Sequence, residues 1–289
     1  MKSLLGRMLL SSEFQSTIGG LLLRFFVQKT QGIYNYSARF LLDSQATERP
    51  HYAYCMLAAA DLARRLGHKR ISVLEFGVAG GNGLAFIRDF AGKAERAIGV
   101  AFDIYGFDTG EGMPPPEDSR DLPHWFRESQ YRMNGDALRD YVPEAKLVLG
   151  NIKDTAPSFV EQFRPAPIGA LFNDVDYYSS TMHSFSIFDA VDRLPDCFLP
   201  RIFMYMDDIL GTELEMYGPY NGQLAAIGDY NDSRDNSKIH LNQNLISQAH
   251  LRYRYQIYYV HLLSHPKYQE YIGGGQQEFL EGALKLRRK

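Results

Sequence analysis

The sequence is short of the features that mark several common kinds of protein. It has two cysteines, Cys55 and Cys197, which are too few for a disulfide framework and lack the spacing of a zinc site. We therefore expect a reducing, cytoplasmic location. The net charge is only −3, which gives no electrostatic reason to expect a nucleic-acid partner.

A long hydrophobic run is also missing. The most apolar stretch, residues 18–27, is interrupted by Arg24 and is shorter than the roughly 20 residues that span a bilayer. No small-residue cleavage site follows, so we predict neither a secretory signal nor a transmembrane segment. We interpret the stretch as an amphipathic helix that packs on the domain or on a partner subunit, the second case giving a homo-oligomer. Adhesion to a membrane surface is the alternative.

The length and the apolar patterning favour one large α/β domain. A chain of 289 residues fits one core with extensions. We assign residues 1–50 to an N-terminal helical extension and residues 51–289 to the main domain. Residues 52–66 are rich in helix formers, and Gly67 follows them at a position where glycine commonly ends a helix.

Short apolar runs then alternate with helical patterns. The predicted helices are residues 83–90 and 184–194, and the predicted strands are residues 71–77, 103–107, 146–149, 168–172, 201–206 and 253–261. This alternation predicts a doubly wound, mostly parallel sheet. Its ligand should lie at the carboxyl ends of the strands, where an open α/β sheet leaves a crevice.

The first predicted strand ends in a glycine-rich turn. Glycine lets the backbone turn tightly and approach a ligand, and the following helix start favours a carboxylate or phosphate. The dinucleotide fingerprint is not met, because an alanine stands where its second glycine belongs. An acidic residue two places before the first glycine fits a ligand with an ammonium group, although a simple structural turn is the alternative. The candidate binding residues are Glu75, Gly77, Val78, Ala79, Gly81 and Asn82.

The second and third strands supply further candidates. Asp108, followed by Thr109, closes the second strand, where a carboxylate can accept hydrogen bonds from ribose hydroxyls. Its distance from Gly77 exceeds the roughly 20 residues of a compact unit, so we expect an insertion around residues 93–101. At the third strand end, Asn151 and Ile152 can contact the edge and face of an adenine ring.

The fourth and fifth strands lead into acidic residues. They are followed by Asp174 and Asp176, and by Asp207 and Asp208. Neighbouring carboxylates raise each other's pKa unless a cation joins them, and oxygen ligands suit Mg²⁺ or Mn²⁺. Such an ion can acidify a substrate hydroxyl. The alternative is that the aspartates cap helices or face solvent, and Asp174 can instead serve a cofactor.

Two residues are candidates for catalysis. Asp176 belongs to the acidic group, and His183 follows it closely enough to act as a proton acceptor. An ordinary surface or packing role is the alternative for His183.

These segments resemble the class I S-adenosylmethionine-dependent methyltransferases and, more narrowly, the macrocin O-methyltransferase family. The resemblance rests on residues 74–81, 105–114 and 174–181, the last followed by the aspartate pair 207–208. It implies that Glu75 and the Gly77 loop hold the methionine end of the cofactor and that Asp108 holds its ribose. It also implies a magnesium site made by Asp207, Asp208 and one aspartate of the Asp174/Asp176 pair.

The resemblance makes an S-adenosylmethionine-dependent O-methyltransferase the leading hypothesis, with a hydroxyl of a small molecule or sugar as acceptor. The sequence departs from the family pattern at Thr109 and Val175 and beyond about Asn231. A metal-independent methyltransferase with another acceptor and a non-catalytic cofactor-binding protein are the alternatives.

Overall fold

The computed structural model describes residues 8–274, 281–282 and 284. The outermost parts of the two predicted segments, residues 1–7 and most residues after 274, lie outside this description.

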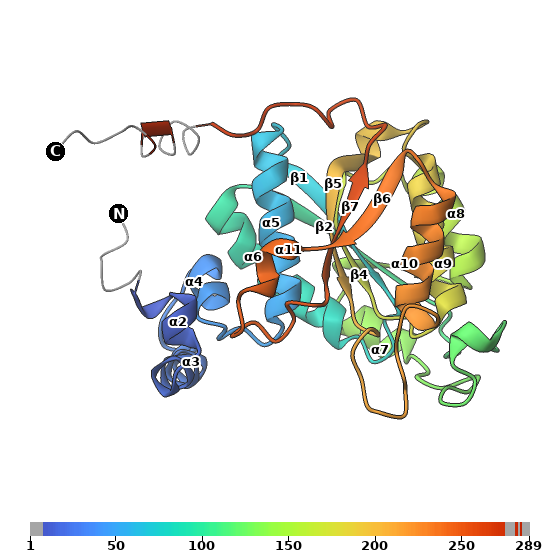
Figure 1. Cartoon of the computed structure of the whole chain (residues 1–289), viewed down its shortest axis with the longest axis horizontal. Helices are drawn as coiled ribbons and strands as arrows, with labels where there is room; N and C mark the ends of the chain where they lie inside the picture. The colour runs from blue at the N-terminus through green and yellow to red at the C-terminus, as the bar shows by residue number, and fades with distance from the viewer. Residues whose placement is uncertain (1–7, 275–280, 283, 285–289) are drawn as a thin grey trace.

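A seven-stranded sheet forms the centre of the molecule (Figure 1). Its order is β3-β2-β1-β4-β5-β7-β6; the first five strands along the chain pair in parallel, and β7 pairs antiparallel with both β5 and β6. The predicted doubly wound, mostly parallel sheet is therefore confirmed. The strands are β1 (Arg70–Phe76), β2 (Ala101–Asp108), β3 (Ala145–Leu149), β4 (Ile168–Asn173), β5 (Phe198–Met206), β6 (Ser237–Leu241) and β7 (Ile257–Leu262).

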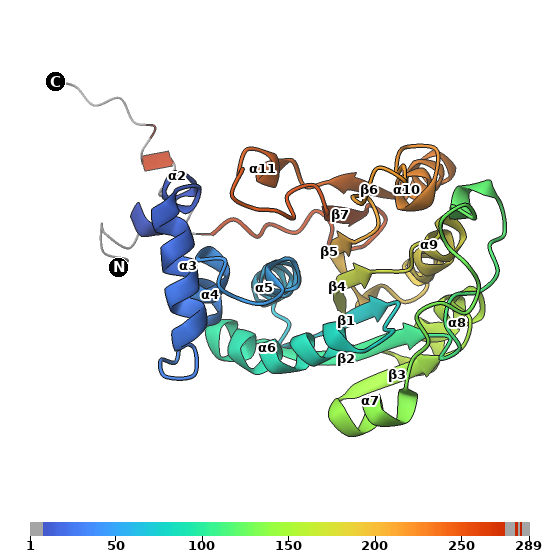
Figure 2. The ribbon, with the colours of Figure 1, turned by 90° about the horizontal axis from the view of Figure 1, so that it is seen from below.

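Helices cover both faces of this sheet (Figure 2). One face carries α4 (Ala38–Asp43), α5 (Pro50–Arg65) and α6 (Asn82–Ile98), and the other carries α8 (Ile152–Phe163), α9 (Tyr178–Phe185) and α10 (Gly222–Ser233). The central strands β1 and β4 are buried on both faces, which explains why most of their residues are apolar. The remaining short elements are α2 (Ser12–Gln15), η1 (Ser119–Asp121), α7 (Gly135–Tyr141), η2 (Ser186–Ala190), η3 (Pro195–Cys197) and α11 (Gln243–Ile246).

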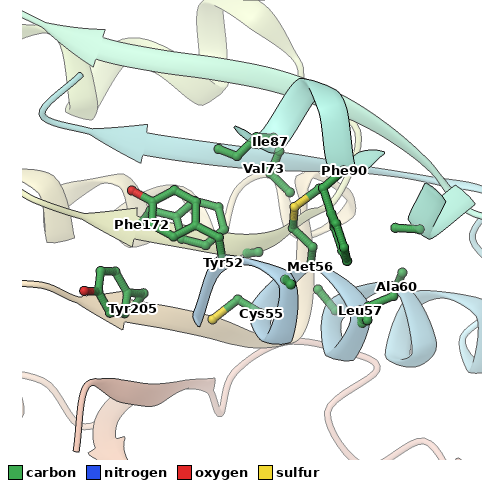
Figure 3. Packing of buried hydrophobic residues seen from close by; sticks show 14 of the residues in the cluster. Tyr52, Cys55, Met56, Leu57, Ala60, Val73, Ile87, Phe90, Phe172 and Tyr205 are labelled. Atoms are coloured by element: carbon green, nitrogen blue, oxygen red, sulfur yellow. The ribbon is translucent and has the colours of Figure 1, made fainter. Parts of the chain in front are cut away.

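Helix α5 contributes many residues to the hydrophobic core on its face of the sheet (Figure 3). Pro50 occupies its first turn, where the missing N–H costs nothing. At its other end Gly67 has φ +81°, and the amide of His68 donates to the Ala63 carbonyl at 2.9 Å, which closes the helix as expected for a glycine there. Tyr52 stacks on Phe172 of β4, with ring centres 4.0 Å apart. This contact fixes the start of α5 beside the carboxyl end of the sheet.

The segment before Pro50 contributes to the same core. Ala38 and Leu42 of α4 belong to the apolar cluster of α5. Helix α3 (Ile18–Thr30), in contrast, lies at the edge of the molecule (Figure 2). The amphipathic helix expected at residues 18–27 is thus present, and the division of the chain at residue 50 stays a prediction. Among the described residues, no helix combines the length and apolar character that crossing a bilayer demands.

Several sequence predictions need correction. No insertion separates β1 from β2; helix α6 runs on to Ile98, and this length accounts for the spacing. The helix predicted at residues 184–194 begins earlier, at Tyr178, and continues after Phe185 as a 3₁₀ turn. The last strand begins at Ile257, because residues 252–256 form a turn.

Candidate active site

A cavity of about 460 Å³ opens where the strand order reverses. Strands β1 and β4 are neighbours in the sheet, but the strands that follow β1 in the chain lie on one side of this pair and the strand that follows β4 lies on the other. Open α/β sheets bind ligands at such a reversal of the strand order. The ends of four strands meet there, since Glu75, Asp108, Asp174 and Asp207 all line the cavity. The structure therefore brings the main sequence candidates together.

Most predicted site residues contribute to the lining. Those that do are Glu75, Gly77, Val78, Ala79, Asn82, Asp108, Thr109, Ile152, Asp174, Asp176, Asp207 and Asp208. Gly81, Asn151 and His183 are not among the lining residues. Gly81 precedes α6 in a left-handed conformation, and Asn151 caps α8 by accepting a hydrogen bond from the Lys153 amide at 2.9 Å. His183 lies in the last turn of α9.

Glu75 is the most deeply placed charged group of the cavity. Only 2% of it is exposed, and burial raises the pKa of its carboxyl to about 7. Its Oε1 accepts a hydrogen bond from the Tyr52 hydroxyl at 2.6 Å, and the Leu84 amide also interacts with the carboxyl and lowers its pKa. Its buried Oε2 has no hydrogen-bond partner in the part of the chain described. Gly83 makes room for it, because a Cβ there would lie 1.6 Å from Oε1. Burial disfavours the ionised form of this carboxyl, and a cationic ligand at its free oxygen would stabilise that form.

Asp108 has a structural task that the sequence does not reveal. Its Oδ2 accepts hydrogen bonds from the amides of Val78 and Ala79 at 3.0 and 2.9 Å, and its Oδ1 accepts one from Gly110 at 2.7 Å. The carboxylate thus braces the turn after β1. A carboxylate offers about four acceptor positions, so these bonds leave space for about one more donor.

The turns after β1 and β4 touch each other. The Asp174 amide donates to the Phe76 carbonyl at 2.9 Å. Gly77 has φ +83°, and a Cβ on it would lie 1.7 Å from the Asp174 carbonyl oxygen. Only glycine permits this approach, which places the aspartates beside the glycine turn.

Three of the four aspartates form a compact group. Asp174, Asp207 and Asp208 each offer an oxygen, and these oxygens lie within 4.8 Å of one another. Asp208 is anchored, since its Oδ2 accepts from the Asp176 amide at 2.8 Å and from the Gln223 side chain at 3.0 Å. The left-handed conformation of Asp176, with φ +59°, aims its backbone amide at Asp208.

The electrostatics of this group show uncompensated negative charge. Burial first, and then Asp208 and Asp207, raise the pKa of Asp174. Burial and then Asp174 raise the pKa of Asp176 to about 7, and burial together with Asp176 raises the pKa of Asp208. A cation bound among these carboxylates would offset their mutual repulsion and favour their ionised forms.

The donor set fits a hard divalent cation. All ligands on offer are carboxylate oxygens, which Mg²⁺ prefers. Two of the carboxylates are already oriented by hydrogen bonds: Asp208 by Gln223, and Asp207 by the Tyr205 hydroxyl. Asp174, rather than Asp176, belongs to the compact group.

The remaining lining of the cavity comes from residues that the sequence analysis did not name as site residues. They include Arg49, Met113, Phe126, Tyr131, Leu210, Glu215 and Tyr217. Asp121 holds the loop after β2 in place: its buried carboxylate accepts from the amides of Ser179 and Glu117, both at 2.7 Å, and from the Ser179 hydroxyl at 2.8 Å. Aromatic residues in the long loop after β2, such as Phe126 and Tyr131, are the sequence signal that could have indicated its contribution to the cavity.

A second hollow, of about 640 Å³, lies elsewhere, between α4, α5 and the segment around α11. It is lined by Leu57, Arg201 and Leu251 among others, and by none of the acidic residues of the first cavity. The acidic residues at the strand ends therefore all belong to the smaller cavity.

Comparison with known proteins finds similar solved structures. No protein-family model and no curated protein matches the chain. Among solved structures, the calicheamicin methyltransferase CalS11 has a TM-score of 0.49 at 16% identity, over 85% of this chain and 93% of that one. The O-methyltransferase NovP has a TM-score of 0.44 at 13% identity, over 86% and 98%. An O-methyltransferase from Bacillus cereus in complex with SAH has a TM-score of 0.38 at 10% identity, over 86% and 94%. At these values the function has to be argued from the site.

Proposed function

We propose that this protein is an S-adenosylmethionine-dependent methyltransferase that acts on a hydroxyl group of a small molecule or sugar. The carrying observation is Glu75, a buried carboxylate with a free oxygen in the crevice at the strand reversal. It shares one cavity with Asp108 and the aspartate group, as the proposal requires. The sequence resemblance of the same segments supports it.

Each part of the cavity then has a task. Glu75 accepts hydrogen bonds from the ammonium group of the cofactor, and the free acceptor position of Asp108 takes a ribose hydroxyl. Ile152 and Thr109, which line the same cavity, contact the nucleoside. When bound, S-adenosylmethionine supplies an activated methyl group, so the protein contributes mainly position.

The acceptor binds against the apolar and aromatic lining that Phe126, Tyr131 and Leu210 provide. The carboxylates line the same cavity. This arrangement suits an uncharged substrate whose hydroxyl points toward the aspartates, because an anionic substrate would meet like charge. Asp176 lines this cavity and takes up the hydroxyl proton in our proposal.

We propose that Asp174, Asp207 and Asp208 hold Mg²⁺. The spacing and the chemistry of their oxygens support this ligand set. When bound, the ion lowers the pKa of a hydroxyl that coordinates it.

Calorimetry with S-adenosylhomocysteine tests the cofactor assignment. We expect one binding site per chain, and no binding by folded protein refutes the proposal. With a library of hydroxylated acceptors, transfer of a labelled methyl group should be lost with EDTA, restored by Mg²⁺ and lost in Asp207→Asn. Transfer that ignores EDTA and this substitution favours a metal-independent enzyme, and tight cofactor binding without transfer favours a non-catalytic protein.

We also propose that helix α3 pairs with the same helix of a second chain. Large apolar side chains recur on it at three- and four-residue steps and are more than half exposed: Ile18, Leu21, Leu22, Phe25 and Phe26. Such a stripe matches its own copy across a twofold axis. Light scattering should give a dimer, and Leu22→Glu should give a monomer. A monomeric wild-type chain that binds lipid vesicles indicates membrane adhesion instead.

A cytoplasmic location stays part of the proposal. Both cysteines, Cys55 and Cys197, are buried free thiols, which suits a reducing compartment. Fluorescence microscopy of the tagged chain in its host cell tests it, and signal confined to an oxidising compartment contradicts it.

A further inference from the structure

Arg49 reaches the cavity from the segment that precedes the main domain. It is the residue immediately before α5, and it lines the cavity. Its guanidinium carbon lies 5.1 Å from the centre of the Tyr52 ring, and the hydroxyl of that ring touches Glu75. Arg49 and Glu75 therefore face the same end of the cavity.

The guanidinium of Arg49 is not committed to another group of the protein. Among the described residues it has no hydrogen bond or ion pair, and it lies over the Tyr52 ring. Other arginines of the chain pair with carboxylates, such as Arg39 with Asp61. The positive charge of Arg49 acts on the cavity, since it lowers the pKa of Glu75 and of Asp174 against the effect of burial.

An amino-acid moiety has the complementary chemistry. Its single α-carbon carries an ammonium group and a carboxylate, so a binding site for it needs an acid and a base side by side. Glu75 offers a buried oxygen without a partner, and Arg49 offers five N–H donors in a planar fork that matches a carboxylate.

We infer that Arg49 binds the α-carboxylate at the methionine end of the cofactor while Glu75 binds the ammonium group. This inference rests on the proposed function. It gives the segment before Pro50 a direct part in the site, which neither the resemblance nor the glycine turn indicates. Recognition of an anionic group on the acceptor is the competing role for Arg49.

A pair of ligands separates these roles. S-adenosylhomocysteine carries the amino-acid moiety, and 5′-methylthioadenosine keeps the nucleoside and the sulfur but lacks that moiety. Calorimetry is run with both ligands on the wild type, Arg49→Met, Arg49→Lys and, as a matched control outside the cavity, Arg39→Met. We expect Arg49→Met to weaken S-adenosylhomocysteine about tenfold to a hundredfold and to leave 5′-methylthioadenosine unchanged. Arg49→Lys should recover part of the loss, because it keeps the charge without the fork.

Three results overturn the inference. Equal affinity of Arg49→Met and the wild type for S-adenosylhomocysteine excludes the carboxylate role and leaves the acceptor role. Equal loss for both ligands means that Arg49 supports the fold of the site. A wild type that binds neither ligand refutes the proposed function itself. This failure is seen in the wild type alone, whereas failure of the inference about Arg49 is seen only in the variants.

Discussion

Replacing Glu75 by Gln separates the charge of this residue from its shape. Gln keeps an oxygen for the Tyr52 hydroxyl, which now bonds Oε1 at 2.6 Å, and it fits the space beside Gly83. What is lost is the negative charge that faces the cofactor ammonium in the proposed complex. A hydrogen bond to a charged group contributes about 1.5–3 kcal/mol, so Glu75→Gln should weaken S-adenosylhomocysteine binding about tenfold to a hundredfold at pH 8.

The pKa of Glu75 adds a second, sharper expectation. Burial raises it to about 7, and the ammonium ligand binds only the ionised form. The affinity of the wild type should therefore rise with pH through this value, because at pH 6 only about one tenth of the carboxyl is ionised. Calorimetry from pH 6 to pH 8 should show about a tenfold gain in affinity for the wild type. Glu75→Gln should show a clearly smaller gain, since only other groups of the cavity, such as Asp176 with a pKa of about 7, still titrate there.

The matched control is Glu161→Gln, since Glu161 is an exposed residue that pairs with Arg193 outside the cavity. It should behave as the wild type at every pH. Wild-type affinity that does not change between pH 6 and pH 8, or a Glu75→Gln variant with full affinity at pH 8, refutes the reasoning about Glu75.

Three further predictions concern the frame of the site. Gly83→Ala places a Cβ 1.6 Å from Oε1 of Glu75, so we expect about 1–3 kcal/mol loss of stability in urea unfolding together with loss of S-adenosylhomocysteine binding; unchanged values for both contradict the packing argument. Asp121→Ala removes a buried acceptor of three hydrogen bonds and should lower the free energy of unfolding by about 3 kcal/mol. The control is Asp136→Ala, which breaks an exposed ion pair and should leave the free energy of unfolding nearly unchanged. His183 does not line the cavity, so His183→Ala should change the rate of methyl transfer far less than the roughly hundredfold effect of removing a proton acceptor, and a loss of that size returns His183 to the mechanism.

The sheet and the acidic group could be predicted because their signals are local. Buried parallel strands such as β1 and β4 are nearly continuous apolar runs, and the residues at their ends must meet at one edge of the sheet. Strand β6 was missed, since its five residues carry only a weak alternating pattern. Helix α8 was missed because Pro157 lies inside it, at a position where proline removes a helical hydrogen bond and usually signals a helix end.

The residues that were missed or misplaced in the site depend on long-range geometry. Arg49 comes to Glu75 only because Tyr52 stacks on β4, a contact that no sequence spacing announces. His183 was a candidate because it closely follows Asp176 in the sequence, and the helix was expected to begin only after it, at Ser184. In the structure that helix begins at Tyr178, and its register brings Ser180 to the cavity instead.

The close contact between Gly77 and Asp174 joins the two halves of the cavity. The Gly77 backbone lies against the Asp174 carbonyl, and the two segments share a hydrogen bond. We therefore expect a ligand that shifts one turn to shift the other, and any such coupling between the two halves is reciprocal. Saturating one half should change the affinity of the other by the same factor in both directions.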